Sequence, residues 1–274
     1  MSQKGFLLAI LSVFILAACG GGGGAEEVVQ PQESVDVLYN RAKGALGQQK
    51  YKTATKYFDE VERQHPYSKW AKQAQLMAAY SSYLDQRYDE AVIALDRFIE
   101  LHPGSDKIDY AYYLKALSYY EQISDVRRDQ DMTERAMQSL GTLIRLFPES
   151  DYARDAKLKL DLTSDHLAGK EMEIGRYYLN RGHINAALSR FTTVVRDYDT
   201  TTHTAEALHR LVEGYLTLGL KDQATKIAAV LGYNYPGSKW YERSYGLLDD
   251  EQRAKLIDNR GFVDRTIETL FKPD

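Results

Sequence analysis

The sequence is poor in several residue types, and each shortage excludes a class of protein. Only one cysteine occurs among its 274 residues, so neither an internal disulfide nor a cysteine-rich zinc site can form. Basic residues do not exceed acidic ones, since Lys and Arg total 35 and Asp and Glu total 39, for a formal net charge of -4. Non-specific nucleic-acid binding needs a basic surface, and we therefore expect no nucleic-acid partner.

The sequence motifs of common catalytic sites are missing as well. There is no glycine-rich phosphate loop, no Gly-x-Ser-x-Gly and no His-Glu-x-x-His. Among the six histidines, His203 and His209 are six residues apart, a spacing that does not place them on one helix face. We predict that the chain is not an enzyme and holds neither a metal ion nor a cofactor.

The single cysteine stands at the end of an N-terminal apolar segment. Lys4 precedes a nearly continuous apolar run over residues 5–16, and the small residues Ala17 and Ala18 stand directly before Cys19. The run is shorter than the ~20 residues of a membrane-spanning helix and is typical of a secretory signal. Its last residues resemble the bacterial lipobox, although an ordinary signal peptide with an incidental cysteine is the alternative.

The lipobox resemblance implies a covalent lipid. Cys19 would carry S-diacylglycerol and an N-acyl chain after cleavage behind Ala18, and two or more chains anchor a protein stably. We predict a signal peptide at 1–18 and a lipidated flexible linker at 19–33, where the glycines at 20–24 show no periodicity. Resemblance to Gram-negative lipoproteins, with Gly20 in place of aspartate, implies the inner leaflet of the outer membrane, facing the periplasm.

From residue 34 onward the sequence repeats. Five short turns are marked by a proline or, once, an aspartate, and successive markers are separated by 37, 45, 51 and 37 residues. Alanine stands 12 residues before each marker, mostly large apolar residues stand eight and five before, a hydroxyl residue two after and a small residue eight after. In chain order the markers and columns are Pro66, Pro103, Pro148, Asp199, Pro236; Ala54, Ala91, Ala136, Ala187, Ala224; Phe58, Leu95, Leu140, Phe191, Ala228; Val61, Phe98, Leu143, Val194, Leu231; Ser68, Ser105, Ser150, Thr201, Ser238; and Ala74, Ala111, Ala156, Ala207, Ser244.

These columns predict pairs of helices that stack closely. The apolar columns share one helix stripe, the hydroxyl residue stands where a helix N-cap is expected, and proline stops the preceding helix. The pattern resembles the tetratricopeptide repeat (TPR), a helix–turn–helix of about 34 residues. We expect an all-α, TPR-like solenoid of about five repeats, with its concave side lined by the first helices.

The predicted array spans residues 34–238, followed by a helical tail at 239–274. The repeats fall at about 34–66, 69–103, 106–148, 151–199 and 202–236, and the third carries an insertion near 123–132. The fourth contains an extra helix over 151–167, which we expect to end at a break near Ala168 and Gly169. Whether the array hinges there stays open.

Tyrosine is unusually frequent, with 21 residues against 8 phenylalanines. Several tyrosines recur on one face of the first helix in each of the first three predicted repeats, which we call the first-helix stripe. Tyrosine gives a large contact area at low entropic cost, so the stripe predicts a groove for an extended peptide ending in an aromatic residue. The alternative is that these tyrosines simply pack between helices. The candidate groove residues are Tyr39, Lys43, Gln73, Tyr80, Tyr83, Tyr110, Tyr113 and Tyr120.

A lipobox followed by irregular TPR units resembles the BamD (ComL) family, outer-membrane lipoproteins of the β-barrel assembly machinery. The resemblance covers the chain to about residue 238. Its local matches are Asp96-Arg97-Phe98-Ile99, Ile108-Asp109-Tyr110, Arg128-Asp129-Gln130-Asp131, Tyr177-Tyr178-Leu179-Asn180-Arg181-Gly182, and the segment from Arg190 to Arg196-Asp197-Tyr198.

The family resemblance implies a scaffold rather than an enzyme. It implies binding to the periplasmic POTRA region of a BamA-like barrel protein, other assembly-complex lipoproteins as partners, and receipt of unfolded outer-membrane proteins. Arg190 matches the family's arginine that pairs with a POTRA carboxylate. Another periplasmic TPR adaptor lipoprotein, such as a secretin pilot or a cell-division coordinator, is the alternative.

Overall fold

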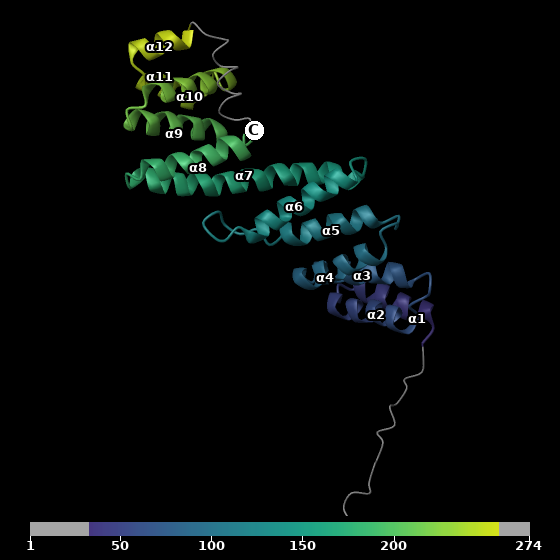
Figure 1. The fold of residues 1–274 in the computed structure, drawn as a ribbon. Coiled ribbons are helices and arrows are strands. Elements are labelled where there is room, and N and C mark those ends of the chain that lie inside the picture. The colour runs from purple at the N-terminus through teal and green to yellow at the C-terminus, as the bar shows by residue number, and fades with distance from the viewer. Residues whose placement is uncertain (1–32, 258–274) are drawn as a thin grey trace, which may run out of the picture. The chain divides into compact units, whose positions relative to one another are not determined.

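Helices alone make up the regular structure of residues 33–257, the part of the chain that this computed structural model describes (Figure 1). The predicted signal peptide, Cys19, nearly all of the linker and the end of the tail lie outside the described residues. The helices are α1 Val35–Gly47, α2 Tyr51–Gln64, α3 Ala71–Leu84, α4 Tyr88–Leu101, α5 Ile108–Tyr120, α6 Asp131–Leu146, α7 Asp151–Asn180, α8 Ile184–Asp197, α9 Thr204–Thr217, α10 Lys221–Asn234, α11 Lys239–Leu247 and α12 Asp250–Ile257.

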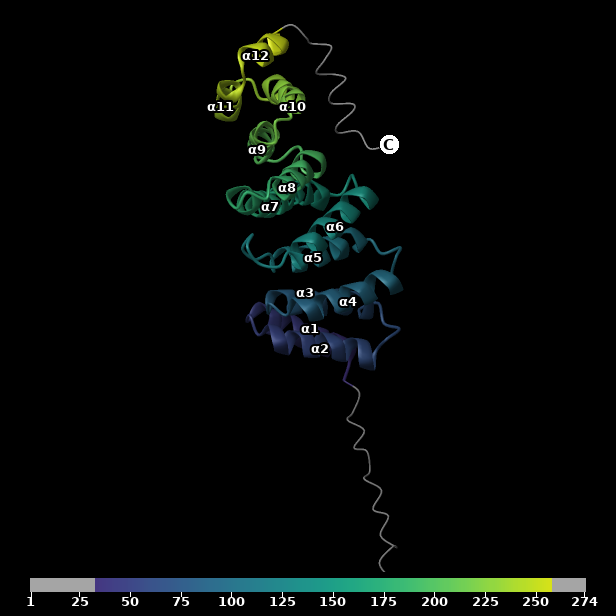
Figure 2. The same cartoon turned by 60° about the vertical axis from the view of Figure 1, so that its left-hand side comes forward.

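The helices from α1 to α10 form antiparallel pairs that stack in chain order (Figures 1 and 2). At the C-terminal end of the stack, α11 packs on α9 and α10, and α12 packs on α10. Each predicted repeat contains one such pair: α1–α2, α3–α4, α5–α6, α7–α8 and α9–α10. The fold is therefore the all-α helical-hairpin solenoid that the periodicity predicts. We call α1, α3, α5, α7, α9 and α11 the first helices.

The repeat columns form the core of the stack. All residues of the four apolar and small columns are at most 1% exposed, including the fully buried Phe58 and Phe191. Where two helices approach closely, a residue outside the columns is small too: an added Cβ on Gly175 of α7 would lie only 2.4 Å from the Phe191 ring. The seam between helices is thus filled by alternating large and small residues, as close packing requires.

The turn inside a repeat needs one residue in the left-handed region. Four of the five turns have it at the same place, 17 residues before the marker: Gln49 (φ 58°), Gln86 (φ 59°), Gly182 (φ 77°) and Gly219 (φ 75°). Glycine adopts this conformation without a Cβ clash, whereas glutamine does so at a cost. The third repeat replaces this turn with its insertion.

The predicted hydroxyl N-cap is present in two of five cases. Ser150 and Ser238 are the N-cap residues of α7 and α11, and each accepts a backbone N–H at 3.2 Å. Ser68 and Ser105 also accept a backbone N–H, at 3.1 and 3.3 Å, but the N-caps of α3 and α5 are the later residues Trp70 and Lys107. The Thr201 hydroxyl donates to the carbonyl of Tyr198 at 2.8 Å, and the N-cap of α9 is His203. The N-cap prediction was therefore wrong in three of the five repeats.

The expected break near Ala168 and Gly169 is also wrong. One continuous helix, α7, runs from Asp151 to Asn180, so the extra helix and the first helix of the fourth repeat are a single element. Glycine serves close packing here: a Cβ on Gly169 would meet the His203 ring at 3.2 Å and Val126 at 3.6 Å. Gly169, where the sequence predicted a break, is instead the point at which His203 and Val126 pack against α7.

The insertion between α5 and α6 is held against α7. The buried Gln130 donates to the carbonyls of Asp125 and Arg128, at 3.2 and 3.0 Å, and its own oxygen lies 3.0 Å from His166 Nδ1 on α7. Lys170 Nζ donates to the carbonyl of Arg128 at 3.1 Å. The loop is therefore an ordered part of the stack.

Candidate binding surfaces on the first helices

Tyrosines of α3 and α5 gather as the first-helix stripe predicts. Ring centroids of Tyr80 and Tyr110 lie 6.5 Å apart. Tyr152, at the start of α7, lies 5.3 Å from Tyr110 and stacks on Tyr113 at 5.0 Å. We call Tyr80, Tyr83, Tyr110, Tyr113 and Tyr152 the tyrosine cluster; all five side chains are partly exposed.

Carboxylates fix two hydroxyls of the tyrosine cluster. Tyr113 donates to Asp155 of α7 at 2.5 Å, and Tyr83 donates to Glu121 at 3.4 Å. Burial, followed by the charge of Glu121, raises the pKa of the Tyr83 phenol to about 12. Burial likewise raises the pKa values of Tyr110 and Tyr113. Tyr83, Tyr110 and Tyr113 therefore present ring faces and neutral hydroxyls to a ligand at any physiological pH.

Four other predicted groove residues do not join the tyrosine cluster. Tyr39 is only 6% exposed and packs between Phe58 and Trp70, so its place in an open groove was wrong. Lys43 and Gln73 are exposed on α1 and α3. Tyr120 packs in the core between α5, α6 and α7, with Lys159 Nζ 5.4 Å from its ring.

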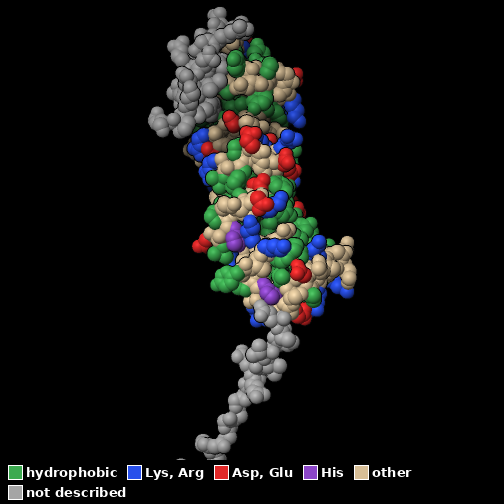
Figure 3. Space-filling view, turned by 90° about the vertical axis from the view of Figure 1, so that its right-hand side faces the viewer, with side chains coloured by type: hydrophobic (Ala, Val, Ile, Leu, Met, Phe, Trp, Pro, Cys, Tyr) green, Lys and Arg blue, Asp and Glu red, His purple; other side chains and the backbone are tan. Residues whose placement is uncertain are grey.

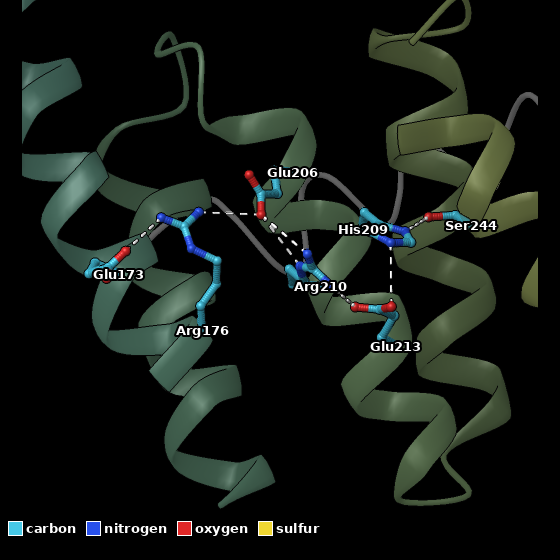
Figure 4. A network of polar contacts seen from close by, with 7 residues as sticks. All are labelled: Glu173, Arg176, Glu206, His209, Arg210, Glu213 and Ser244. Atoms are coloured by element: carbon cyan, nitrogen blue, oxygen red, sulfur yellow. Dashed lines mark hydrogen bonds and ion pairs between the residues drawn. The ribbon is translucent and has the colours of Figure 1, made fainter. Parts of the chain in front are cut away.

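The first helices of the C-terminal half carry a ladder of charges instead of tyrosines (Figure 4). Arg176 of α7 lies between Glu173 (3.1 Å) and Glu206 of α9 (3.3 Å). Arg210 then links Glu206 (3.4 Å) to Glu213 (2.7 Å). We call Glu173, Arg176, Glu206, Arg210 and Glu213 the charged ladder.

A buried histidine connects the charged ladder to α11. His209, 3% exposed, has Nε2 3.5 Å from Glu213 and Nδ1 2.8 Å from Ser244 Oγ (Figure 4). The contact with His209, followed by that with Arg210, lowers the pKa of Glu213 to about 2. Trp240 covers this end, 5.3 Å from the His209 ring and with the guanidinium of Arg243 5.0 Å from its own centroid.

Ring residues at the starts of first helices link the repeats, and sequence reasoning missed them. Trp70, Tyr152 and Trp240 each stand four residues after a marker, and each packs on the preceding first helix. His203 stands at the same position and lies on α7. Alignment of this column would have found them, since three of its five members are aromatic.

Arg190, the candidate partner-binding residue, lies on α8. Its Nη1 contacts both oxygens of Glu171 on α7, at 3.1 and 3.3 Å. The Arg190 side chain keeps 42% of its surface exposed, whereas Glu171 keeps 18%. An internal carboxylate thus orients the guanidinium and leaves part of it accessible.

Charges of both signs are interspersed with hydrophobic side chains on the face drawn in Figure 3, rather than gathered into one patch. Within residues 33–257 no group of His, Cys, Asp and Glu is arranged to hold a metal ion. Over the same residues, no helix has the length and apolar character needed to cross a membrane.

Comparison with known proteins decides the family. The YfiO family, described as outer membrane lipoprotein, matches residues 31–231. The outer membrane protein assembly factor BamD of Caulobacter vibrioides is 46% identical over 268 residues, which are 97% of this chain and 88% of the relative. That of Rickettsia prowazekii is 48% identical over 253 residues, 92% of this chain and all of the relative. This chain belongs to the BamD family.

Similarity to solved structures is lower. The TPR domain of P58(IPK) matches with a TM-score of 0.41 and 14% identity, covering 86% of this chain and 64% of that one.

Proposed function

We propose that this chain is a non-enzymatic scaffold of the outer-membrane β-barrel assembly complex. The observation that carries the proposal is the identity of 46–48% with two proteins named outer membrane protein assembly factor, over at least 92% of this chain. A solenoid with an exposed aromatic surface and an internally paired charged surface suits a scaffold. Such a protein holds other polypeptides and needs no reactive group of its own.

In this proposal, a lipid on Cys19 attaches the protein to the membrane. The lipobox resemblance supports S-diacylglycerol and an N-acyl chain on Cys19, which anchor the protein in the inner leaflet of the outer membrane, facing the periplasm. The Gly-rich linker lets the array stand off from the bilayer. Cys19→Ser is expected to abolish incorporation of a labelled lipid precursor and to leave an uncleaved precursor. Normal labelling of that variant would refute the anchor.

The POTRA region of a BamA-like barrel protein is the proposed partner of the C-terminal half. Arg190 supports this proposal, because its guanidinium is oriented by Glu171 and still 42% exposed. A carboxylate of the partner can add a second charge-assisted hydrogen bond. Other assembly-complex lipoproteins are further proposed partners.

The tyrosine cluster is the proposed receiving surface for unfolded outer-membrane proteins. Its rings are partly exposed, and the hydroxyls of Tyr113 and Tyr83 are held by Asp155 and Glu121, so these two side chains lose little entropy on binding. The rings of Tyr80 and Tyr110 are 6.5 Å apart. Alternate side chains on one side of an extended strand are separated by about 6.6 Å, so such a strand can place one on each ring.

Affinity purification from detergent-solubilised envelope tests the proposed function. The wild-type chain should recover a POTRA-containing barrel protein, and recovery of a secretin instead would refute the proposal. Arg190→Glu should reduce recovery of the barrel protein, because it places a negative charge opposite the partner's carboxylate. Arg63→Glu is the matched control, since Arg63 is exposed and its ion pair among the described residues is with Glu60 of the same helix. Equal recovery with both variants would exclude Arg190 from the interface.

A further inference from the structure

Two exposed leucines interrupt an otherwise polar face of α7. Leu158 is 63% exposed and Leu162 is 61% exposed. They lie one helical turn apart, on the same side of the helix. The opposite side of this segment is already buried, where Ala153 and Ala156 are at most 1% exposed. The N-terminal half of α7 is therefore apolar on two opposite faces, and only one of them is covered.

The repeat pattern explains why this face is open. Leu158 stands ten residues after its marker, the position that Tyr113 and His209 occupy in other repeats. There a ring from the start of the next first helix covers it: Tyr152 lies on Tyr113 at 5.0 Å and Trp240 on His209 at 5.3 Å. The next first helix is α9, and the His203 ring at its start lies against Gly169, further along α7, because α7 continues unbroken to Asn180. Leu158 is therefore left without a covering ring.

Charge and position indicate what replaces the missing ring. Arg154 and Lys157 lie within one turn of Leu158, both are exposed, and neither makes an ion pair within residues 33–257. On the other side of Leu158, Asp155 accepts a hydrogen bond from the Tyr113 hydroxyl. The two leucines therefore adjoin the tyrosine cluster. A ligand that fits has an aromatic side chain, a nearby carboxylate, and further apolar side chains reaching toward the tyrosines.

We infer that Leu158 and Leu162 form a docking shelf for the aromatic side chain at the carboxyl end of an extended peptide, with Arg154 and Lys157 binding its carboxylate. The inference rests on the proposed receipt of unfolded outer-membrane proteins. Strands of such proteins alternate apolar and polar residues and carry aromatic residues near the membrane interfaces. The peptide's upstream apolar side chains lie on the tyrosine cluster, and its last ring takes the place that Tyr152 and Trp240 fill elsewhere.

Binding of synthetic peptides to the purified full chain in lipid nanodiscs tests the shelf. The probe is a fluorescent nonapeptide with alternating apolar residues, a C-terminal phenylalanine and a free carboxylate; a second probe ends in alanine. Leu158→Ala with Leu162→Ala should weaken binding of the first probe about tenfold and leave the second unchanged, since only the ring uses the shelf. Ile93→Ala, at a 70% exposed position of α4, is the matched control and should change neither affinity.

A third probe, with an amidated C-terminus, tests the carboxylate. Arg154→Gln with Lys157→Gln should weaken binding of the free acid several-fold and leave that of the amide unchanged. The shelf is refuted if the double leucine variant binds the phenylalanine probe within twofold of wild type, or loses the same factor for both peptides. If no peptide binds the wild-type chain, the proposed receipt of unfolded substrates fails, and the shelf fails with it.

Discussion

The two halves of the stack use equivalent positions of the first helices in opposite ways. In the N-terminal half these positions carry tyrosines, whose rings remain partly exposed. In the C-terminal half Arg176 and Glu213 stand where Tyr80 stands, and Glu206 stands where Tyr110 stands. Together with Arg210 they form ion pairs across α7 and α9. A surface of partly exposed rings can bind another polypeptide, whereas paired charges hold neighbouring repeats in place. One architecture thus carries a partly exposed aromatic surface in one half and an internally paired, charged surface in the other.

Removal of the covering tryptophans should have the largest effect in both halves. Trp70 and Trp240 occupy the same repeat position and both are partly buried against the preceding first helix. We expect Trp70→Ala and Trp240→Ala each to lower the free energy of unfolding by about 2–3 kcal/mol, measured by urea unfolding. Tyr67→Ala, at a fully exposed position, is the control and should change it by less than about 0.5 kcal/mol. A loss confined to one tryptophan would show that the halves also differ in how repeats are joined.

Breaking the charged ladder should have the next largest effect. Glu206 is 16% exposed and accepts from both Arg176 and Arg210, so Glu206→Ala leaves two half-buried guanidinium groups without this acceptor. We expect a loss of about 1–2 kcal/mol in the free energy of unfolding. Glu60→Ala removes an exposed pair with Arg63 on α2 and should cost less than about 0.5 kcal/mol. Equal losses would contradict a structural role for the ladder.

Substitutions in the turns should change the free energy of unfolding in opposite directions in the two halves. Gln86 adopts φ 59° in the N-terminal half, and Gly219 adopts φ 75° at the equivalent position in the C-terminal half. Gln86→Gly should raise the free energy of unfolding by about 0.5 kcal/mol, and Gly219→Ala should lower it by about 1 kcal/mol. The same sign for both substitutions would show that backbone strain is not what distinguishes these turns.

Acid should act on the C-terminal half through Glu213. The pKa of its carboxyl is lowered from 4.5 to about 2 in the folded protein, so its contribution is complete above pH 4.5 and disappears as the pH falls toward 2. We expect the stability difference between wild type and Glu213→Gln to be constant from pH 5 to 7 and to shrink below pH 4.5. A difference that persists unchanged at pH 2.5 would contradict the lowered pKa.

Local patterns were predictable from the sequence, and contacts between repeats were not. The alanine, phenylalanine and leucine columns recur at fixed intervals, so the buried faces of the helices could be read directly. Gly169 misled because a glycine inside a helix costs only about 1 kcal/mol, which packing against His203 and Val126 overcomes. Tyr39 misled because the ring that buries it, Trp70, comes from the next repeat.

The charged ladder and the tyrosine cluster also differ in how far the sequence predicts their contacts. Tyr80 and Tyr110 belong to one stripe, so their sequence spacing predicts that they lie near each other. The pairing of Arg176 with Glu206 joins residues 30 apart on two helices, and only the position of α9 against α7 brings them together. Sequence spacing therefore predicts the tyrosine cluster but does not predict the charged ladder.

One binding measurement tests the division between the halves most directly. The affinity of an extended peptide with alternating apolar side chains is determined for Tyr80→Ala with Tyr113→Ala, and for Glu206→Ala, while circular dichroism monitors the helices. We predict at least tenfold weaker binding for the tyrosine variant, unchanged binding for Glu206→Ala, and helical spectra for both. Unchanged affinity in the tyrosine variant, or an equal loss in both variants, would contradict the account.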